Sequence, residues 1–344
     1  MRLSVLFCVL AVAVKKIAVL GAGSWGTTLA ILLAKKGHEV SLWEYLKEQA
    51  ERLDRERENR QFLHGVLIPK EIFISSNLKE IIERKEIILI VVPSQVLREV
   101  VEKLSKIKIP PKTILISATK GLEVGTNLRM SQIIKSYFPK NRIVVVSGPS
   151  HAEEVSRKMP ATIVASASSE KLSREIQEVF TTSYFRVYTN PDTVGVELGG
   201  ALKNIIAIAS GICDGLGLGD NSKAALMTRG VAEISRLGVA MGSKKETFAG
   251  LSGIGDLITT CISKHSRNRG LGERIAKGKR LEEAQKEIGM VTEGVPTTKS
   301  AYELAKKYKV EVPITKELYN ILFKGKDPRD AEFELMTRKT ERKE

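Results

Sequence analysis

The chain has few cysteines and few histidines, which leaves little material for disulfides or zinc sites. Cys8, Cys213 and Cys261 lie far apart without a Cys-x-x-Cys spacing, and only 4 histidines occur in 344 residues. This pattern predicts neither a disulfide framework nor a zinc site, and we expect no bound metal. We also expect a reducing compartment and a cytoplasmic location.

The N-terminus carries an apolar run, but the run is too short to cross a membrane. Residues 3–14 follow Arg2, and Ala11-Val12-Ala13 resembles a signal-peptidase site. A membrane-spanning helix needs roughly 20 apolar residues, and cleavage after Ala13 would leave the chain starting almost directly on an expected strand. We interpret residues 1–15 as an N-terminal extension or the result of a mis-chosen start codon, with a signal peptide as the alternative. No stable membrane insertion is expected.

Negative charge is in deficit, because 55 lysines and arginines stand against 40 aspartates and glutamates, for a formal net charge of +15. Clustered basic residues would indicate a nucleic-acid surface. Here they are scattered among glutamates, and even the densest basic run, residues 338–343, contains Glu341. We therefore prefer a solvated surface with a general attraction for anionic metabolites, and expect no nucleic-acid partner.

A composition of 42% apolar and 28% charged side chains is typical of a globular protein. The length of 344 residues is greater than a single hydrophobic core usually supports, so we expect two domains. Up to about residue 190, short β-branched runs alternate with helical stretches, as in successive βαβ units. The expected strands are residues 16–20, 40–43, 72–75, 87–92, 114–117, 143–146, 162–165 and 185–188. Residues 87–92 are apolar without alternation, which is typical of a parallel strand buried on both faces. The prediction is an α/β Rossmann-type, doubly wound sheet.

The strand signal disappears from Thr193 onward, where long helical segments are separated by glycine-rich breaks. Residues 189–192 are the expected junction, because Pro191 restricts its predecessor and Asp192 can cap the next helix. We therefore expect a sheet domain over residues 16–191 and an all-helical domain over residues 192–344.

Three glycines follow the first expected strand in the pattern Gly-x-Gly-x-x-Gly. Gly21, Gly23 and Gly26 stand between the strand at 16–20 and a helical stretch at 27–36. The first permits a tight turn, the second lets backbone approach a pyrophosphate, and the third lets helix and strand pack closely. An ordinary tight turn is the alternative, but the position between strand and helix favours dinucleotide binding.

An acidic residue ends the second expected strand. Glu44 is near the position at which a carboxylate bonds the ribose hydroxyls of NAD and repels the 2′-phosphate of NADP. Lys47, one turn further on, can offset that repulsion. We expect NAD or NADP as cofactor, with NAD favoured.

Small polar loops follow three further strands. They are Pro93-Ser94-Gln95, Ala118-Thr119-Lys120-Gly121 and Gly148-Pro149-Ser150-His151. Ligands bind outside the carboxyl ends of strands in parallel sheets. The alternative is that these residues only form the turns between elements. Three small polar loops, one with a lone lysine, are more than such turns require, so we favour a ligand site.

A helical segment in the second part is apolar nearly all round. Residues 197–209 include only Glu197, Lys203 and Asn204 as strongly polar side chains, so the helix should be buried. Burial lowers the pKa of a lysine towards the range of a general acid or base. A lysine that extends to the surface, or one held by a carboxylate, is the alternative to a catalytic Lys203.

A second polar group follows further along the chain. Asp256 and Thr260 are four residues apart and share a face if the segment is helical. Arg267, flanked by Ser266 and Asn268, offers a guanidinium fork and two neutral groups for one phosphate. A capped loop with surface arginines explains the same spacing equally well.

These segments together resemble the glycerol-3-phosphate dehydrogenase family, over nearly the whole chain from Lys16 on. The order of the matching segments is GAGSWGT, SATKGLE, SGPSHAEEV, ELGGALKNIIAIASG, LMTRG, GLSGIGDLITTC and SRNR. The resemblance implies a nicotinamide-dependent dehydrogenase that interconverts glycerol 3-phosphate and dihydroxyacetone phosphate for phospholipid synthesis. It also implies a C-terminal domain like that of 6-phosphogluconate dehydrogenase, and we expect a homodimer.

The resemblance further implies roles for individual residues. Lys203 would accept the proton from the alcohol, and the active site would also contain Lys120, Asn204, Asp256 and Thr260. The phosphate of the triose would be held by Arg267 and Asn268, with contacts from Gly148, Ser150 and Ser266. Cofactor contacts would come from Ser24, Trp25, Ala152, Val291 and Glu293, besides Gly21, Gly23, Gly26, Glu44, Pro93, Lys120 and Arg267.

Some features depart from the family pattern, and other interpretations stay open. The segment before Lys16 has no family counterpart, and bacterial relatives often carry a basic or imidazole side chain near Glu44 and Tyr45 that favours NADP. A dehydrogenase for 3-hydroxyacids or sugar acids is one alternative, against which residues 266–268 argue. A nucleotide sensor or nucleic-acid-binding module is another, but such a protein has no need of a buried Lys203.

Overall fold

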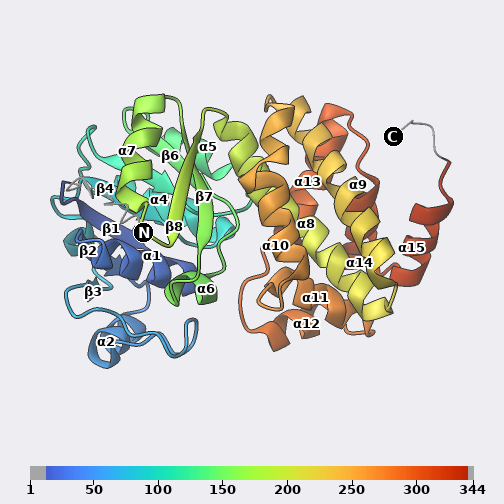
Figure 1. Cartoon of the computed structure of the whole chain (residues 1–344), viewed down its shortest axis with the longest axis horizontal. Helices are drawn as coiled ribbons and strands as arrows, with labels where there is room; N and C mark the ends of the chain where they lie inside the picture. Colours follow the sequence, from blue (N-terminus) through green and yellow to red (C-terminus); the bar gives the residue numbers. More distant parts are fainter. Residues whose placement is uncertain (1–12, 340–344) are drawn as a thin grey trace, which may run out of the picture.

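The computed structural model describes residues 13–339. A half that contains the sheet, up to Asn190, and a helical half, from Thr193, lie side by side along the long axis of the molecule (Figure 1). Most of the apolar N-terminal run, Cys8 and the end of the basic tail lie outside the described residues.

Eight strands form one sheet, and each lies within two residues of an expected strand. They are β1 (Lys16–Leu20), β2 (Glu39–Trp43), β3 (Phe73–Ser75), β4 (Ile87–Ile90), β5 (Ile114–Ser117), β6 (Arg142–Ser147), β7 (Ala161–Ala167) and β8 (Phe185–Asn190). Their order across the sheet is β3-β2-β1-β4-β5-β6-β7-β8. All four residues of β4 are buried, as the lack of alternation predicted.

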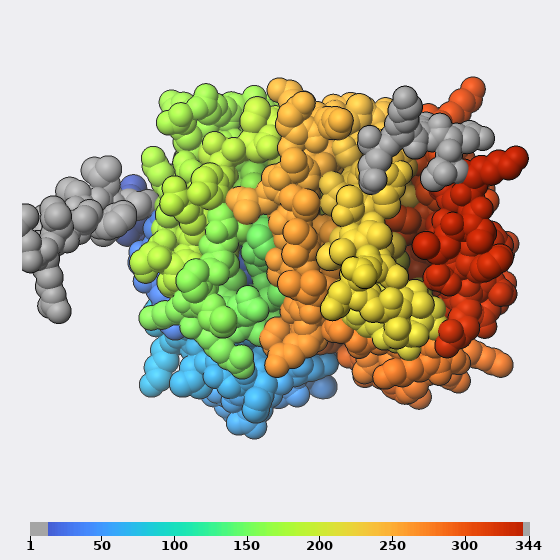
Figure 2. All heavy atoms as spheres, turned by 45° about the vertical axis from the view of Figure 1, so that its right-hand side comes forward, coloured from blue at the N-terminus to red at the C-terminus, as the bar shows by residue number. Residues whose placement is uncertain are grey.

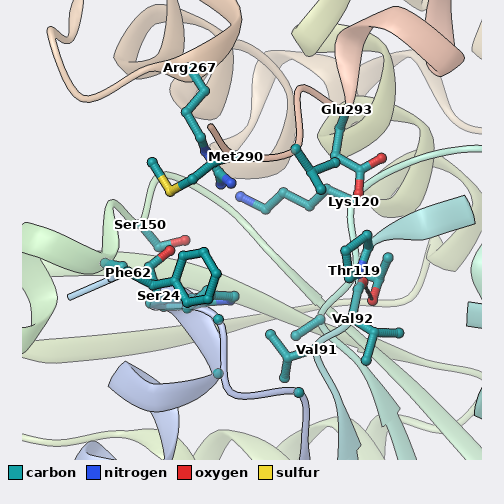
Figure 3. A pocket seen from close by; sticks show the side chains of 18 of the residues that line it. Ser24, Phe62, Val91, Val92, Thr119, Lys120, Ser150, Arg267, Met290 and Glu293 are labelled. Atoms are coloured by element: carbon teal, nitrogen blue, oxygen red, sulfur yellow. Dashed lines mark hydrogen bonds between the residues drawn. The ribbon is translucent and has the colours of Figure 1, made fainter. Parts of the chain in front are cut away.

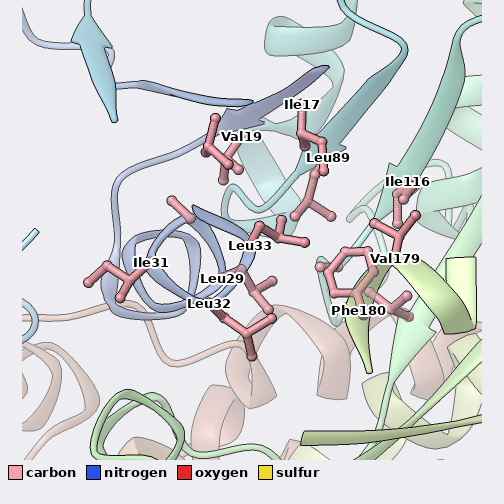
Figure 4. Packing of buried hydrophobic residues seen from close by; sticks show 14 of the residues in the cluster. Ile17, Val19, Leu29, Ile31, Leu32, Leu33, Leu89, Ile116, Val179 and Phe180 are labelled. Carbon is pink, nitrogen blue, oxygen red and sulfur yellow. The ribbon is translucent and has the colours of Figure 1, made fainter. Parts of the chain in front are cut away.

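Helices cover both faces of the sheet, which confirms the doubly wound prediction. They are α1 (Ser24–Lys35), α2 (Lys47–Glu56), α3 (Leu78–Ile82), η1 (Ser94–Val96), α4 (Leu97–Ser105), α5 (Met130–Tyr137), α6 (Ala152–Ser156) and α7 (Glu170–Phe180). Successive side chains of β1 enter separate cores, because Ile17 and Val19 pack with α1 and α7 while Ala18 and Leu20 pack with α4 and α5. Figure 4 shows the first of these cores, with Phe180 facing Leu33.

The last two strands run opposite to the other six. β7 pairs antiparallel with β6, with Ser147 opposite Val164, and β8 is parallel to β7. The six neighbouring strands β3, β2, β1, β4, β5 and β6 are therefore parallel to one another, and the sheet as a whole is mixed and not wholly parallel as expected. Side-chain alternation is the same in either strand direction, so the reversal of β7 and β8 could not be predicted from the sequence. As a result β8 ends at the edge opposite to the carboxyl ends of β1 to β6.

The helix that follows, α8 (Thr193–Leu216), begins at this opposite edge and runs back along β6. Asp192 caps it, because its Oδ1 accepts a hydrogen bond from the N–H of Gly195 at 2.9 Å. By Gly200 the helix has reached the end of β6, where an added Cβ would lie 2.3 Å from Oγ of Ser147. Lys203, one turn later, lies just beyond the carboxyl ends of the parallel strands.

Every further described element is helical. These are α9 (Gly219–Ala240), η2 (Lys245–Ala249), η3 (Leu251–Gly255), α10 (Asp256–Ile262), α11 (Arg267–Ala276), α12 (Leu281–Ile288), α13 (Gly294–Tyr308), α14 (Pro313–Lys324) and α15 (Pro328–Thr337). Among the described helices, α8 alone has the length and apolar composition to cross a membrane, yet 89% of its most apolar window is buried inside the protein. It is the central helix of this half, and α9 and α10 lie beside each other on the face shown in Figure 2. The domain boundary that we expect between residues 191 and 192 stays a prediction.

α8 and α11 cross in close contact because each has a glycine at the crossing. A Cβ on Gly211 would lie 1.9 Å from the carbonyl oxygen of Arg269, and one on Gly272 would lie 2.0 Å from that of Ile208. No other residue type fits at these positions without moving a backbone. The crossing brings the polar face of α8 against the start of α11.

Candidate active site

A pocket opens between the two halves, at the carboxyl ends of the parallel strands (Figure 3). It is lined by the glycine turn before α1, the end of β2, the loops after β4, β5 and β6, and parts of α8, α10, α11 and the segment before α13. Every candidate site residue lines it except Gly148, whose carbonyl oxygen accepts a hydrogen bond from Nζ of Lys120 at 2.8 Å. Residues more than 200 positions apart in the chain thus share one cavity.

The glycine turn leaves room for a phosphate group on its open side. Gly21 has φ of +113°, and a Cβ on Gly26 would lie 1.8 Å from the carbonyl oxygen of Gly21. A Cβ on Gly23, in contrast, would meet nothing within 4 Å. Gly23 is the N-cap of α1, without a side-chain cap and without an acidic residue in the first turn. The N–H groups and the positive end of the helix dipole therefore suit the pyrophosphate of a dinucleotide.

Glu44 lies at the end of β2, in the wall of the pocket. It is buried, and one carboxylate oxygen accepts a hydrogen bond from the N–H of Leu46 at 3.1 Å. Burial raises the pKa of this carboxyl, while hydrogen bonds from the backbone of Leu46 and Tyr45 act in the opposite direction. In dinucleotide-binding folds of this kind, an acidic side chain after the second strand generally hydrogen-bonds the adenosine ribose.

Several apolar and aromatic residues of the pocket were not predicted from the sequence. They are Trp43, Tyr45, Phe62, Val91, Val92, Val96 and Met290. Tyr45 directly follows Glu44, so its position beside the second strand was a usable signal. Phe62 and Met290 come from segments outside any motif, and only the tertiary fold brings them to the site.

A buried charge cluster forms the opposite end of the pocket. The side chain of Lys203 is 7% exposed, and its Nζ lies 2.8 Å from Oδ1 of Asp256 and 2.6 Å from Oγ1 of Thr260. The other oxygen, Oδ2 of Asp256, accepts a hydrogen bond from Lys120 at 2.6 Å. The Thr260 hydroxyl donates to the backbone oxygen of Asp256 at 2.6 Å, so its lone pairs face Lys203. Lys203 thus does not extend to the surface, and the carboxylate that holds it is itself shared with a second amine.

These charges shift one another's proton affinity. Burial lowers the pKa of Lys203 to about 8, with the carboxylate of Asp256 opposing this shift and the charge of Lys120 adding to it. Burial by itself would raise the pKa of Asp256, but Lys120 and Lys203 outweigh it and hold that pKa below its usual value. The cluster therefore keeps one negative charge between two amines, and one of these amines can exchange a proton near pH 8.

At the start of α11, two polar residues have hydrogen-bond partners within the protein, whereas a third extends into the pocket. Asn268 donates a hydrogen bond to Oδ1 of Asn204 at 3.0 Å, and its own Oδ1 accepts one from the N–H of Gly294 at 2.9 Å. Ser266 caps α11 by accepting from the N–H of Arg269 at 3.2 Å. Arg267 is exposed, and Figure 3 shows it and Lys120 extending into the same region of the pocket.

One buried contact joins the two halves at the rim of the pocket. Glu293 accepts hydrogen bonds from the N–H of Ser94, at 2.8 Å, and from the Ser94 hydroxyl. Burial raises the pKa of the Glu293 carboxyl, although these hydrogen bonds act against the shift. Val291 and Ala152 line the same pocket. No cluster of three or more His, Cys, Asp or Glu side chains suited to a metal ion occurs within residues 13–339.

A sheet edge shaped for a dinucleotide, facing an amine that can exchange a proton near neutral pH, is the arrangement of a nicotinamide-dependent oxidoreductase. Two family models agree with this class. Residues 16–173 match the N-terminal model of NAD-dependent glycerol-3-phosphate dehydrogenase, and residues 192–332 match its C-terminal model. The chain belongs to the NAD-dependent glycerol-3-phosphate dehydrogenase family.

Individual relatives are similar over nearly their whole length. The glycerol-3-phosphate dehydrogenase [NAD(P)+] of Thermoanaerobacter sp. (strain X514) is 55% identical over 94% of this chain and 97% of its own. The protein of the same name from Carboxydothermus hydrogenoformans is 52% identical over 94% and 96%. The crystal structure of glycerol-3-phosphate dehydrogenase from Coxiella burnetii superposes with a TM-score of 0.91 at 40% identity, covering 94% of this chain and 99% of that one.

Proposed function

We propose that the protein interconverts glycerol 3-phosphate and dihydroxyacetone phosphate, with NAD or NADP as hydride carrier. The observation that carries this proposal is the buried amine of Lys203, which faces the glycine turn across one pocket and lies 2.8 Å from Asp256. The names of the relatives supply the substrate. The glycine turn and the first turn of α1 fit the cofactor's pyrophosphate, as the open space at Gly23 indicates.

In the proposed reaction, Lys203 exchanges the proton of the C2 hydroxyl. A nicotinamide held beside the glycine turn, Ser24 and Trp25 would supply the hydride chemistry at C2, as acceptor in alcohol oxidation and as donor in ketone reduction. The neutral amine of Lys203 accepts the hydroxyl proton in oxidation, and its ammonium form donates that proton in reduction. Thr260 and Asp256 orient this amine through the hydrogen bonds described above. Lys120 adds positive charge beside the developing alkoxide.

The phosphate of the substrate is assigned to the start of α11. Arg267 offers a guanidinium fork in the pocket, and Asn268, fixed by Asn204, stands beside it. Ser266 and Ser150 line the same region, and Gly148 positions Lys120 through its carbonyl oxygen. A positive side chain opposite the buried amine selects a phosphorylated triose over a neutral ketone.

The proposed cofactor contacts follow the opposite wall. Gly21, Gly23, Gly26, Ser24 and Trp25 surround the pyrophosphate position. Further contacts are assigned to Pro93, Ala152, Val291 and Glu293. Because Glu44 is a carboxylate at the ribose position, it favours NAD over NADP.

The cellular setting belongs to the same proposal. The enzyme acts in the cytoplasm, where it supplies glycerol 3-phosphate for phospholipid synthesis. It works as a homodimer, so sedimentation should give twice the mass of the 37.9 kDa chain. A monomeric mass at micromolar concentration would contradict the dimer without affecting the proposed reaction.

The decisive experiment replaces the amine and leaves the dinucleotide site alone. Lys203→Ala should lower kcat with dihydroxyacetone phosphate and NADH by about 10²- to 10⁴-fold, the usual contribution of a general acid. Binding of NADH, followed by its fluorescence, should be nearly unchanged. Lys277→Ala, an exposed lysine in the same half, is the matched control. Wild-type turnover of dihydroxyacetone should be far slower than that of its phosphate, and an active Lys203→Ala enzyme would refute the assignment.

A further inference from the structure

A second cavity lies in the helical half, away from the candidate active site. It is lined by α9, by the end of α13 with the turn into α14, and by α15. None of its lining residues belongs to the pocket between the two halves. Figure 2 shows α9 in yellow and the C-terminal helices in red at this outer end of the molecule.

The lining of this cavity is strongly basic. Seven of its side chains are lysine or arginine, and three are glutamate. The glutamates already have partners, because Lys326 lies 2.5 Å from Glu317 and 2.7 Å from Glu334, while Arg338 lies 3.3 Å from Glu311. Lys326 does not line the cavity and is not one of the seven basic lining residues. The cavity therefore has an excess of positive charge that its own carboxylates do not balance.

Three lysines contribute most directly to that excess. Lys306 and Lys309 stand at the end of α13, and Lys316 stands in the first turn of α14, all of them exposed. Lys306 lies over the ring of Tyr302, 4.1 Å from its centroid, and both residues line the cavity. Like charges that converge on a concave surface repel each other and are stabilised by an anion with several charges.

The framework beneath the lysines is fixed. The buried Glu233 of α9 accepts hydrogen bonds from the N–H groups of Ile314 and Thr315, both at 2.8 Å, and from the Thr315 hydroxyl. The start of α14 is thereby tied to α9, and its N–H groups are already used. Any anion in the cavity is consequently held by side chains and not by the helix terminus.

We propose that this cavity binds a small polyanion that carries a diphosphate group, at a site separate from the candidate active site. Six neutral residues form part of the wall beside the basic ones, namely Tyr302, Ala305, Val310, Val312, Pro313 and Leu335. A diphosphate matches the excess of charge better than a single phosphate, because two adjacent phosphoryl groups engage lysines from both α13 and α14. The source is either free pyrophosphate or a nucleoside diphosphate.

The experiment is a calorimetric titration with pyrophosphate and, separately, with ADP, at 0.15 M salt and with one equivalent of NADH, which fills the dinucleotide site without an excess that could compete at the second cavity. We expect one saturable site in the wild type and in Arg267→Ala, whose altered residue lies in the other pocket. The double variant Lys309→Gln, Lys316→Gln should bind roughly tenfold more weakly or worse, equivalent to about 1.4 kcal/mol, because it removes two charge-assisted contacts. Tighter binding of ADP than of pyrophosphate would assign the nucleotide as the source, and equal binding the free diphosphate.

Matched variants separate this site from a general effect of charge. Lys70→Gln, Lys140→Gln removes two exposed lysines of the sheet half and should leave the affinity unchanged. Lys309→Arg, Lys316→Arg should retain binding. The rate of NADH oxidation should be unaffected in the double variants of Lys70 with Lys140 and of Lys309 with Lys316. The proposal is overturned if the wild type shows no saturable binding at 0.15 M salt. It is equally overturned if the Gln double variant binds pyrophosphate as tightly as the wild type.

Discussion

At the scale of single residues, the proton exchange of Lys203 determines how the proposed reaction depends on pH. Its pKa is lowered to about 8, so the neutral form increases as pH rises through that value. Alcohol oxidation needs the neutral amine and should rise with pH up to a plateau above about 8. Ketone reduction needs the ammonium form and should fall over the same range. Initial rates in both directions at saturating substrate check this, and parallel profiles would contradict it.

Asp256 offers a second test at the same scale. Its carboxylate opposes the lowering of the Lys203 pKa, so Asp256→Asn should lower that pKa further. The oxidation profile should move to lower pH by a similar amount, on a reduced overall rate. Asp214→Asn, which pairs with Lys223 and Arg269 elsewhere, is the control. A profile that does not move would mean that Asp256 acts only in packing.

Cofactor choice is also decided by a single side chain. Glu44→Gln removes the charge that repels a 2′-phosphate while keeping the shape of the side chain. The ratio of kcat/KM for NADPH to that for NADH should rise about tenfold, equivalent to about 1.4 kcal/mol. Lys47→Gln should move the same ratio the other way. An unchanged ratio in Glu44→Gln would remove the basis for the proposed NAD preference.

At the scale of elements, the crossing of α8 and α11 gives a prediction within one helix. Gly272→Ala places a methyl group 2.0 Å from a backbone oxygen, so it should destabilise the protein by about 1 to 3 kcal/mol or more. Gly270→Ala, two residues away, meets only the flexible end of Arg274 at 3.3 Å. It should be neutral or stabilising by up to about 1 kcal/mol. Thermal unfolding of both variants distinguishes the two positions, and equal midpoints would contradict a close crossing.

The elements themselves were largely predictable, whereas their direction was not. Residues 87–92 predicted a doubly buried strand because apolarity without alternation has one simple structural cause. Asp192 was predictable as a cap from its place after Pro191. The reversal of β7 and β8 was not, because a strand has the same side-chain alternation in either direction. The crossing glycines Gly211 and Gly272 were also missed, since each is required by a backbone carbonyl about 60 positions away, that of Arg269 or Ile208.

At the scale of the whole molecule, the pocket depends on contacts between its two halves. Glu293 and Ser94 join the halves beside the cofactor wall. Glu293→Ala removes two hydrogen bonds to a buried carboxylate, each contributing about 1.5 to 3 kcal/mol. We expect weaker NADH binding and a lower midpoint of thermal unfolding, with the exposed Glu282→Ala as control. Loss of NADH affinity without loss of stability would indicate a cofactor contact alone.

The motifs of the candidate site were predictable from the sequence, whereas the full set of residues that line the pocket was not. Lys203 was predicted from the sequence because a lysine in a helix that is apolar nearly all round has few structural explanations. The spacing of Asp256 and Arg267 was equally compatible with a capped loop, so their assignment depended on the resemblance to a known family. The shared position of Asp256 between Lys120 and Lys203 required the fold, since these residues come from three separate segments. Phe62 and Met290 carried no local signal at all.

Because β7 and β8 are reversed, the number of residues between the start of α8 and Lys203 determines where the reacting amine lies. α8 starts beside Ser166, which pairs with Val145 of β6, and Lys203 is reached about three turns later. One extra residue inserted between Asp192 and Gly199 would turn the amine by about 100° and advance it by about 1.5 Å. The chemistry would then point into the packed interior while the helix stayed intact, so surface loops here tolerate length changes that this span does not.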